Sequence, residues 1–176
     1  MSDPTRTMWE GRYLKVSQQG TWEYAERLGQ IGAAVIVATD EAGRLILVEQ
    51  FRIPIGRRCI ELPAGLVGDE SAGESIVDGA RRELEEETGY LADKIEELGL
   101  FYSSPGMTSE SFMVVRATGL VRTGAGGGSP EEDITVHHVA PADVPAFVRA
   151  ARTSGLGIDA KILLLLDQAT IAYSAA

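Results

Sequence analysis

The sequence has a single cysteine, Cys59, and only two histidines among its 176 residues. An intrachain disulfide is therefore excluded, and a reducing compartment is the expected environment. Because Cys59 lies in a strand-like run between Arg58 and Ile60, we interpret it as a small buried residue rather than a nucleophile. His137 and His138 are neighbours, so on a strand their side chains would point to opposite faces. With Cys59 they form no zinc-binding pattern.

Long apolar runs and an excess of positive charge are absent as well. The run 162–166 is far too short to cross a bilayer, and residues 1–20 hold no apolar stretch of signal-peptide length. We therefore expect a cytoplasmic protein that does not enter a membrane. The 16 Lys and Arg are outnumbered by 26 Asp and Glu, giving a formal net charge of -10. Nucleic-acid binding needs the opposite balance and is not expected.

What is present is the composition of an ordinary globular protein, with 44% hydrophobic and 24% charged residues. The chain is neither collagen-like nor coiled-coil in pattern, and its length suits one domain with at most a small appendage. An acidic chain can still bind a phosphorylated ligand when a divalent cation supplies the positive charge.

Short apolar runs separated by turn residues predict a series of strands. We expect them at residues 9–16, 21–28, 32–39, 44–51, 58–62, 95–102, 111–117 and 134–139. A connector at 65–73 and a glycine-rich mobile loop at 123–133 complete the expected β-rich part. Helices are expected from Ser71 to Gly89, over 142–152 and over 158–173. Helices interspersed among hairpins, without regular βαβ alternation, indicate a mixed α+β sandwich.

The helix predicted before Gly89 carries acidic residues on an unexpected side. At about 100° per residue, Glu87 falls only about 20° from Ile76, inside the apolar arc. Glu83 falls about 20° to the other side of Ile76, with Glu86 some 60° further on. A solvated face would lie opposite the apolar arc, so these three carboxylates border the buried face instead.

This placement needs a compensating positive charge. Glu83 repels Glu86 and Glu87 at helical spacings of three and four residues, and partial burial raises the cost. Arg82 can pair with Glu86, but one guanidinium cannot offset three acids. Oxygen ligands on one helix edge suit a hard divalent cation such as Mg²⁺ or Mn²⁺.

The spacing of these residues resembles a known signature. Gly68, Glu74 and the segment 82–90 reproduce the pattern GX5EX7REUXEEXGU of the Nudix hydrolases, with Leu84 and Tyr90 in the apolar slots. This resemblance implies a Nudix-type α/β/α sandwich with a mixed sheet, in which a loop–helix–loop carries the signature. It also implies metal-dependent hydrolysis of a nucleoside diphosphate linked to another moiety.

Other segments resemble the ADP-ribose pyrophosphatase branch of that family. They are 48–52, 61–66, 104–106 and 159–161. Pro105 lies near the position of the branch's marker proline. The resemblance implies hydrolysis of ADP-ribose or other ADP-sugars to AMP and ribose 5-phosphate. Pyrophosphatases that act on GDP-mannose or another nucleoside diphosphate sugar share much of the pattern and remain an alternative, as does a non-catalytic ligand sensor on the same fold.

The family motif also implies roles for individual residues. Glu83 and Glu87 would be the principal metal ligands, and Glu86 a further ligand or a contact outside the ligand shell. The backbone carbonyl of Ala64 would add a ligand, and the site would hold two or three Mg²⁺ ions, or Mn²⁺. Arg82 would orient the glutamates and, with Glu86, belongs to the expected catalytic set.

A general base is expected outside the helix. The acidic loop 129–134 resembles the one that supplies it in this branch, and alignment places Glu132 at the base position. Glu131 is the near alternative and Glu110 the third, although composition alone would describe 131–132 as a solvated loop. Glu74 has two open readings, as a helix cap together with Ser71 or as a residue that orders the metal site.

Recognition of the substrate is expected from the N-terminal part of the chain. Trp22 resembles the tryptophan that stacks on adenine, and Tyr13 a second aromatic supplied by the partner subunit. Glu23, Arg27 and Arg52 are candidates for base, phosphate or subunit-bridging contacts.

These residues suggest how the chain is organised. Residues 1–31 are expected to form an N-terminal β-hairpin extension for dimerisation and base recognition, and residues 32–176 the Nudix domain. A two-stranded ribbon with this much aromatic surface needs covering, so we expect a homodimer.

Overall fold

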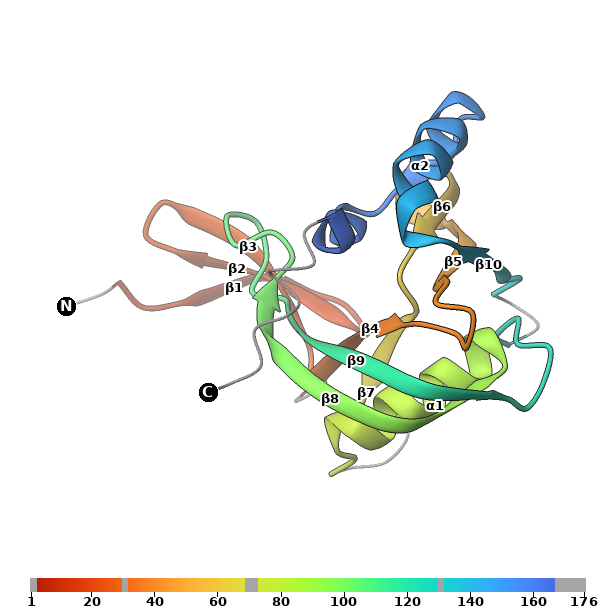
Figure 1. The fold of residues 1–176 in the computed structure, drawn as a ribbon. Coiled ribbons are helices and arrows are strands. Elements are labelled where there is room, and N and C mark those ends of the chain that lie inside the picture. Colours follow the sequence, from red (N-terminus) through yellow and green to blue (C-terminus); the bar gives the residue numbers. More distant parts are fainter. Residues whose placement is uncertain (1–2, 30–31, 69–72, 130–131, 167–176) are drawn as a thin grey trace.

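The computed structural model describes residues 3–29, 32–68, 73–129 and 132–166 (Figure 1). Their strands form three sheets, with the orders β1-β2-β3, β7-β4-β9-β8 and β10-β5-β6-β11. The strands are β1 (Arg6–Glu10), β2 (Leu14–Gln19), β3 (Trp22–Arg27), β4 (Gly32–Ala38), β5 (Leu45–Arg52), β6 (Arg57–Glu61), β7 (Ala64–Val67), β8 (Tyr90–Tyr102), β9 (Ser111–Arg122), β10 (Thr135–Val139) and β11 (Gly157–Ile158).

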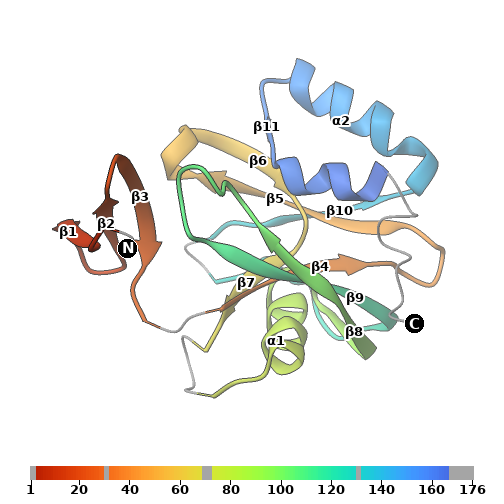
Figure 2. The ribbon, with the colours of Figure 1, turned by 90° about the vertical axis from the view of Figure 1, so that its left-hand side faces the viewer.

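Two α-helices enclose the two larger sheets. Figure 2 shows α1 (Ile76–Thr88) on one side of the strands and α2 (Val144–Thr153) on the other. Pairing is mixed, since β4 runs parallel to β9 and β11 parallel to β6, whereas the other pairs are antiparallel. The predicted α+β fold, an α/β/α sandwich with mixed sheets, is confirmed. No helix in the described ranges is long and apolar enough to cross a membrane.

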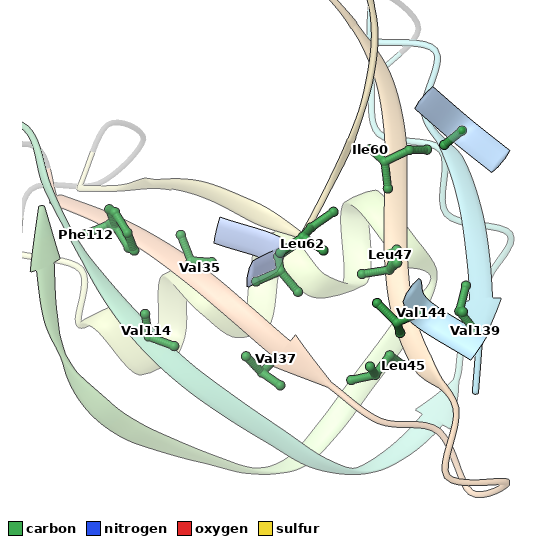
Figure 3. Close-up of a cluster of buried hydrophobic side chains, with 12 residues drawn as sticks. Val35, Val37, Leu45, Leu47, Ile60, Leu62, Phe112, Val114, Val139 and Val144 are labelled. Atoms are coloured by element: carbon green, nitrogen blue, oxygen red, sulfur yellow. The ribbon is translucent and has the colours of Figure 1, made fainter. Parts of the chain in front are cut away.

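The core lies on both faces of β4. Val35 and Val37 pack into one apolar cluster with side chains of β5, β6 and α2 (Figure 3). Ala34, Ile36 and Ala38 alternate with them and face a second cluster, beneath α1. Because successive side chains of a strand point to opposite faces, a strand between two layers is apolar throughout.

The N-terminal extension is a three-stranded sheet, so the expectation of a two-stranded hairpin was wrong. The strand predicted at 9–16 is interrupted at Gly11, whose N–H donates to the carbonyl of Leu14 (2.9 Å). A Cβ at Gly11 would lie 2.3 Å from the ring of Trp9. A side chain at this position would displace the Trp9 indole, and the chain turns here where apolar pattern alone predicted continuity.

The start of α1 also differs from the prediction. Ser71 lies outside the described residues, and the N-cap is Ser75, whose Oγ accepts the N–H of Asp78 (3.1 Å). The proposed cap by Ser71 and Glu74 was therefore wrong, since the helix starts one turn later. The end of the helix is confirmed: Gly89 has a left-handed φ of 73° and its N–H donates to the carbonyl of Glu85 (2.8 Å).

Several predicted boundaries moved because strand pairing extends elements that look polar in sequence. Part of the expected connector at 65–73 is β7, paired with β4. β8 begins at Tyr90 rather than residue 95, because Tyr90 pairs with Arg122 at the extended end of β9. Three 3-10 turns are η1 (Ile53–Ile55), η2 (Pro141–Asp143) and η3 (Ala160–Leu166). The helix predicted over 158–173 is thus a 3-10 helix from Ala160 to Leu166, preceded by β11, and residues 167–173 lie outside the described residues.

Candidate active site

A cavity of about 900 Å³ lies beside the C-terminal half of α1. Charged residues from all parts of the chain line it. The acids are Glu61, Glu83, Glu87, Glu110, Glu132 and Asp159, and the bases are Arg27, Arg52 and Lys161. Carboxylates thus outnumber cations around a space large enough for a small-molecule ligand.

Glu87 is the most deeply buried of the predicted metal ligands, with 3% of its surface exposed. It lies on the apolar side of α1, as the helical periodicity predicted, and its carboxylate accepts the N–H of Ala64 (3.0 Å). The pKa of Glu87 is raised to about 8, mainly by burial and in part by the negative charges of Glu83 and Glu132, against the lowering effect of the hydrogen bond from Ala64. A full negative charge at neutral pH therefore requires additional positive charge beside Glu87.

Glu83 sits against the backbone of β7. A Cβ at Gly65 would lie 1.9 Å from the carboxyl carbon of Glu83, so this approach needs a glycine. The neighbouring Ala64 bonds Glu87, and the structure thereby brings Ala64, Glu83 and Glu87 together. Glu86 is exposed and lies outside the set of residues that line the cavity.

Arg82 connects the helix to the loop before it. Its guanidinium donates to Glu74 (Nε to Oε1, 3.1 Å), to the Leu66 carbonyl (3.0 Å) and to Glu83 (2.9 Å). Glu86 is within 3.5 Å of the same guanidinium. Hydrogen bonding to Glu74 is the main cause of the raised pKa of Arg82. The guanidinium of Arg82 is therefore shared among several acceptors.

Glu74 has its contacts away from the helix N-terminus. Its second carboxylate oxygen accepts the N–H of Gly68 (3.0 Å), and these bonds lower the pKa of Glu74, with Arg82 the main cause. Of the two readings left open, ordering of the site through Arg82 agrees with this geometry, whereas helix capping does not.

The donors around Glu83 and Glu87 fit a divalent cation. Carboxylates and a backbone carbonyl are hard oxygen ligands of the kind that Mg²⁺ and Mn²⁺ prefer. A cation between these carboxylates would also supply the charge that buried Glu87 requires. In the described ranges, no three His, Cys, Asp or Glu side chains are already gathered as a metal cage. Glu83 instead bonds Arg82, and Glu87 bonds Ala64.

The candidates for the general base occupy different surroundings. Glu132 lines the cavity and accepts the N–H of Ser129 (2.7 Å). Glu131 lies outside the described residues. Burial would raise the pKa of Glu110, but hydrogen bonds from Arg27 (2.9 Å) and Ser103 (3.0 Å) outweigh it and lower the pKa. An ion-paired carboxylate of this kind is a poor proton acceptor at neutral pH.

The glycine-rich loop predicted to be mobile is bonded to the end of α1. Gly127 and Gly128 donate their N–H groups to the carbonyls of Glu87 (2.9 Å) and Glu86 (3.0 Å). A Cβ at Gly126 would lie 2.4 Å from the backbone of Thr88. The loop thus satisfies helix carbonyls that would otherwise lack partners.

The predicted recognition residues divide into two groups. Arg27 and Arg52 line the cavity, and Arg52 makes a two-pronged bond with Glu61 (2.8 and 2.7 Å) that raises the pKa of the arginine. Trp22 (63% exposed) and Tyr13 (64% exposed) lie on the N-terminal sheet, outside the residues that line the cavity. Glu23 is likewise exposed on β3 and does not line the cavity.

Sequence reasoning gave no role to Glu61 or to the pair Asp159 and Lys161. The Lys161 ammonium bonds Asp159 (2.5 Å) and lies 5.5 Å from the ring centre of Phe112. Each of these residues lines the cavity. A carboxylate at the end of the apolar strand β6 was the available signal for Glu61, since buried acids are costly unless paired.

The remaining titratable candidates have structural contacts. Burial raises the pKa of the Cys59 thiol to about 11, which agrees with an unreactive buried residue. His137 bonds Glu49 (3.0 Å), whereas His138 bonds the hydroxyl of Tyr90 (3.0 Å). The two imidazoles therefore serve different partners, as their adjacency on a strand predicted.

The sandwich with its acidic helix defines a Nudix domain. Residues 29–154 match the family model described as NUDIX domain, and the chain belongs to this family. It is 35% identical over 126 residues to "Putative nudix hydrolase 2" of Caenorhabditis elegans, covering 61% of this chain and 55% of that one. It is 44% identical over 79 residues to an ADP-ribose pyrophosphatase of Bacillus subtilis, covering 45% and 41%.

Two further similarities cover more of the chain. A GDP-mannose pyrophosphatase of Pectobacterium atrosepticum is 33% identical over 148 residues, covering 80% of this chain and 72% of that protein. The crystal structure of an ADP compounds hydrolase superposes with a TM-score of 0.67 at 22% identity, covering 83% and 82%, and shows the fold alone. The chain spans about half the length of several curated relatives.

Proposed function

We propose that the protein hydrolyses the diphosphate of ADP-ribose and related ADP-sugars, giving AMP and ribose 5-phosphate. The observation that carries this proposal is the burial of Glu87 beside Glu83 and Glu132 at a cavity of about 900 Å³. Such a cluster binds divalent cations, and a cation-loaded acidic cavity accepts a diphosphate. Relatives named ADP-ribose pyrophosphatase support the choice of substrate.

Metal binding falls to Glu83, Glu87 and the carbonyl of Ala64, with Glu86 as an outer contributor. When bound there, two or three Mg²⁺ ions, or Mn²⁺, neutralise diphosphate charge and acidify a water molecule. Arg82 keeps Glu83 and Glu86 oriented through its fork of donors.

Glu132 is our choice for the group that accepts the proton of the attacking water. It lines the cavity from a loop, whereas Glu110 is ion-paired with Arg27, which lowers the pKa of Glu110. Glu131 stays the alternative on sequence grounds. Glu110 is better suited to fix Arg27 at the cavity wall (2.9 Å).

Substrate binding is divided between the cavity and the N-terminal sheet. Arg27 and Arg52 line the cavity and would contact phosphate oxygens. Trp22, Tyr13 and Glu23 would reach a nucleobase from the exposed sheet, Tyr13 from a partner subunit. Stacking on an aromatic ring is worth about 1–3 kcal/mol per base and separates adenine poorly from guanine.

The second candidate substrate is GDP-mannose or another nucleoside diphosphate sugar. The relative named GDP-mannose pyrophosphatase aligns over a larger share of both chains than the one named ADP-ribose pyrophosphatase from Bacillus subtilis. A ligand sensor without catalysis would have no need of Glu83 and Glu87 together at the cavity. We also propose residues 1–31 as an extension that serves dimerisation, and a cytoplasmic location from the single cysteine.

The experiment is incubation with ADP-ribose, GDP-mannose and dinucleoside polyphosphates plus Mg²⁺, with chromatographic identification of the products. We expect AMP and ribose 5-phosphate, no turnover in EDTA, and a higher kcat/KM for ADP-ribose than for GDP-mannose. A reversed ratio would transfer the assignment to the second candidate. Failure to cleave any diphosphate in the panel would refute the proposed reaction.

A further inference from the structure

Arg58 is the centre of a polar cluster on the opposite face of β6 from the cavity. Its guanidinium donates to the side chain and carbonyl of Glu49 (2.6 and 3.0 Å). It also donates to the side chain and carbonyl of Asp133 (2.9 and 3.0 Å) and to the hydroxyl of Thr135 (3.2 Å). His137 completes the cluster by bonding the second carboxylate oxygen of Glu49 (3.0 Å). One side chain thus joins β5 and β6 to the end of the acidic loop.

The residue that Arg58 holds has an unusual backbone. Asp133 has a φ of 47°, and it is the non-glycine residue with positive φ in the described parts of the chain. A left-handed residue of this kind persists where its surroundings fix it, and it often marks a functional segment. Asp133 directly follows Glu132, so the backbone conformation of Asp133 influences the direction in which the Glu132 side chain points.

The other side of the loop is attached to the helix that carries the metal-ligand candidates. Gly127 and Gly128 bond the carbonyls of Glu87 and Glu86, and Ile134 returns its N–H to the Gly127 carbonyl (3.1 Å). These bonds attach the loop to α1 and join its two ends. Asp133 lies between Ile134 and Glu132, and its contact with Arg58 attaches this part of the loop to β6 as well.

Arg58 acts at a distance from the cavity. The neighbouring Cys59 lines the cavity and Arg58 does not, as expected for successive residues of a strand. A contribution of Arg58 to the reaction would therefore pass through the loop. The guanidinium has five donors in a planar fork and contacts five acceptors on Glu49, Asp133 and Thr135, more than the three donors of an ammonium can bond.

We propose that Arg58 is a positioning residue, which holds Asp133 and thereby places Glu132 against the cluster of Glu83 and Glu87. This inference rests on the proposed function, because it assigns Glu132 a proton to accept. A base displaced by about 1 Å can lose up to about 100-fold in rate without loss of binding.

The decisive variant is Asp133→Asn, since it removes the negative charge that pairs with Arg58, leaves Arg58 bonded to Glu49 and tolerates positive φ. With ADP-ribose and Mg²⁺ we expect kcat to fall by about 10-fold to 100-fold and KM to stay within about 2-fold. Arg58→Lys should behave similarly, because the three donors of an ammonium cannot replace the five contacts of the guanidinium. Arg57→Lys, an exposed position on the same strand, is the matched control and should retain wild-type kcat.

The double variant Arg58→Lys with Asp133→Asn supplies a further test. If the two residues act through one contact, its loss in kcat equals that of the worse single variant rather than the product of both. Hydrogen exchange gives a readout independent of turnover: the amides of 127–129 and 132–134 should exchange faster in Asp133→Asn, while those of α1 stay protected.

Unchanged kcat in Asp133→Asn would overturn the inference, as would a fall in Tm of Arg58→Lys without a fall in kcat at 25 °C. The second result would mean that Arg58 only stabilises the contact between β5 and β6. If the wild-type protein cleaved no substrate, the proposed function would fail on its own. Unchanged exchange at 127–129 and 132–134 in Asp133→Asn would then still refute the role of Arg58.

Discussion

Glu87 shares the buried side of α1 with Leu84, and its carboxyl group has one hydrogen bond, from Ala64, among those that the structure shows for the described residues. The helical wheel located this conflict between charge and burial from sequence alone. It did not show that Gly65 opens the backbone of β7 to the carboxylate of Glu83, since β7 itself looked like a connector. A close approach between two elements depends on tertiary packing, which the local sequence pattern does not reveal.

Substituting Glu87 by glutamine tests the electrostatic cost of this burial. The folded pKa of about 8 lies above the usual 4.5, so the carboxyl contributes fully to stability below pH 4.5 and loses that contribution as pH rises toward 8. Glutamine can still accept the Ala64 N–H and has no such dependence. In EDTA, we expect the Tm of Glu87→Gln minus that of wild type to increase from pH 5 to pH 8. A difference independent of pH in differential scanning fluorimetry would contradict this account.

At the scale of elements, the loop over residues 123–129 and the end of α1 depend on one another. Gly89 has positive φ, and its carbonyl accepts the N–H of Thr123 (2.8 Å). The sequence predicted Gly89 as the helix terminator, which is confirmed, and 123–133 as a loop, which is confirmed for residues 123–129 and 132–133. It did not predict the contact between the loop and the helix end. Glycine-rich composition indicates a flexible backbone but does not indicate which element the backbone will contact.

Gly89→Ala separates the two constraints at this position. An added Cβ has to adopt left-handed φ and would also lie 2.4 Å from the carbonyl oxygen of Gly124. Gly43→Ala is the matched control, since Gly43 has a φ of 74° and no atom within 4 Å of its added Cβ. We expect Gly43→Ala to lower the free energy of unfolding by about 1–2 kcal/mol and Gly89→Ala by clearly more. If urea titrations gave equal losses in the free energy of unfolding for the two variants, the close contact between Gly89 and the loop would not contribute to the effect.

At the scale of the whole molecule, the sandwich was predictable and the form of the N-terminal extension was not. The continuous apolar runs of β4 and β5 and the signature of α1 determine the layers. The extension has few buried residues to impose a pattern, so its division into three strands follows from contacts such as Trp9 over Gly11. Its large exposed side chains, Met8, Trp9, Tyr13, Leu14 and Trp22, form the surface on which the proposal of a homodimer depends.

The mass of the protein in solution, measured by sedimentation, tests the proposal of a homodimer directly. A dimer would have about twice the chain mass of 18.8 kDa at micromolar concentration. Trp9→Glu should shift the protein to monomer, whereas Val121→Glu, at an equally exposed apolar position on β9, should leave the mass unchanged. A wild-type protein that sediments as a monomer would contradict the proposal, as would equal effects of the two variants.

The most direct test of the account compares Glu83→Gln with Glu85→Gln, two changes of the same kind two residues apart on α1. Glu83 lines the cavity, whereas Glu85 lies on the other side of the helix. For Glu83→Gln we predict a fall in Mg²⁺-dependent turnover of ADP-ribose of more than about 100-fold and weakened Mn²⁺ binding, with wild-type values for Glu85→Gln. Wild-type turnover in Glu83→Gln would contradict the claim that this carboxylate cluster binds the catalytic metal.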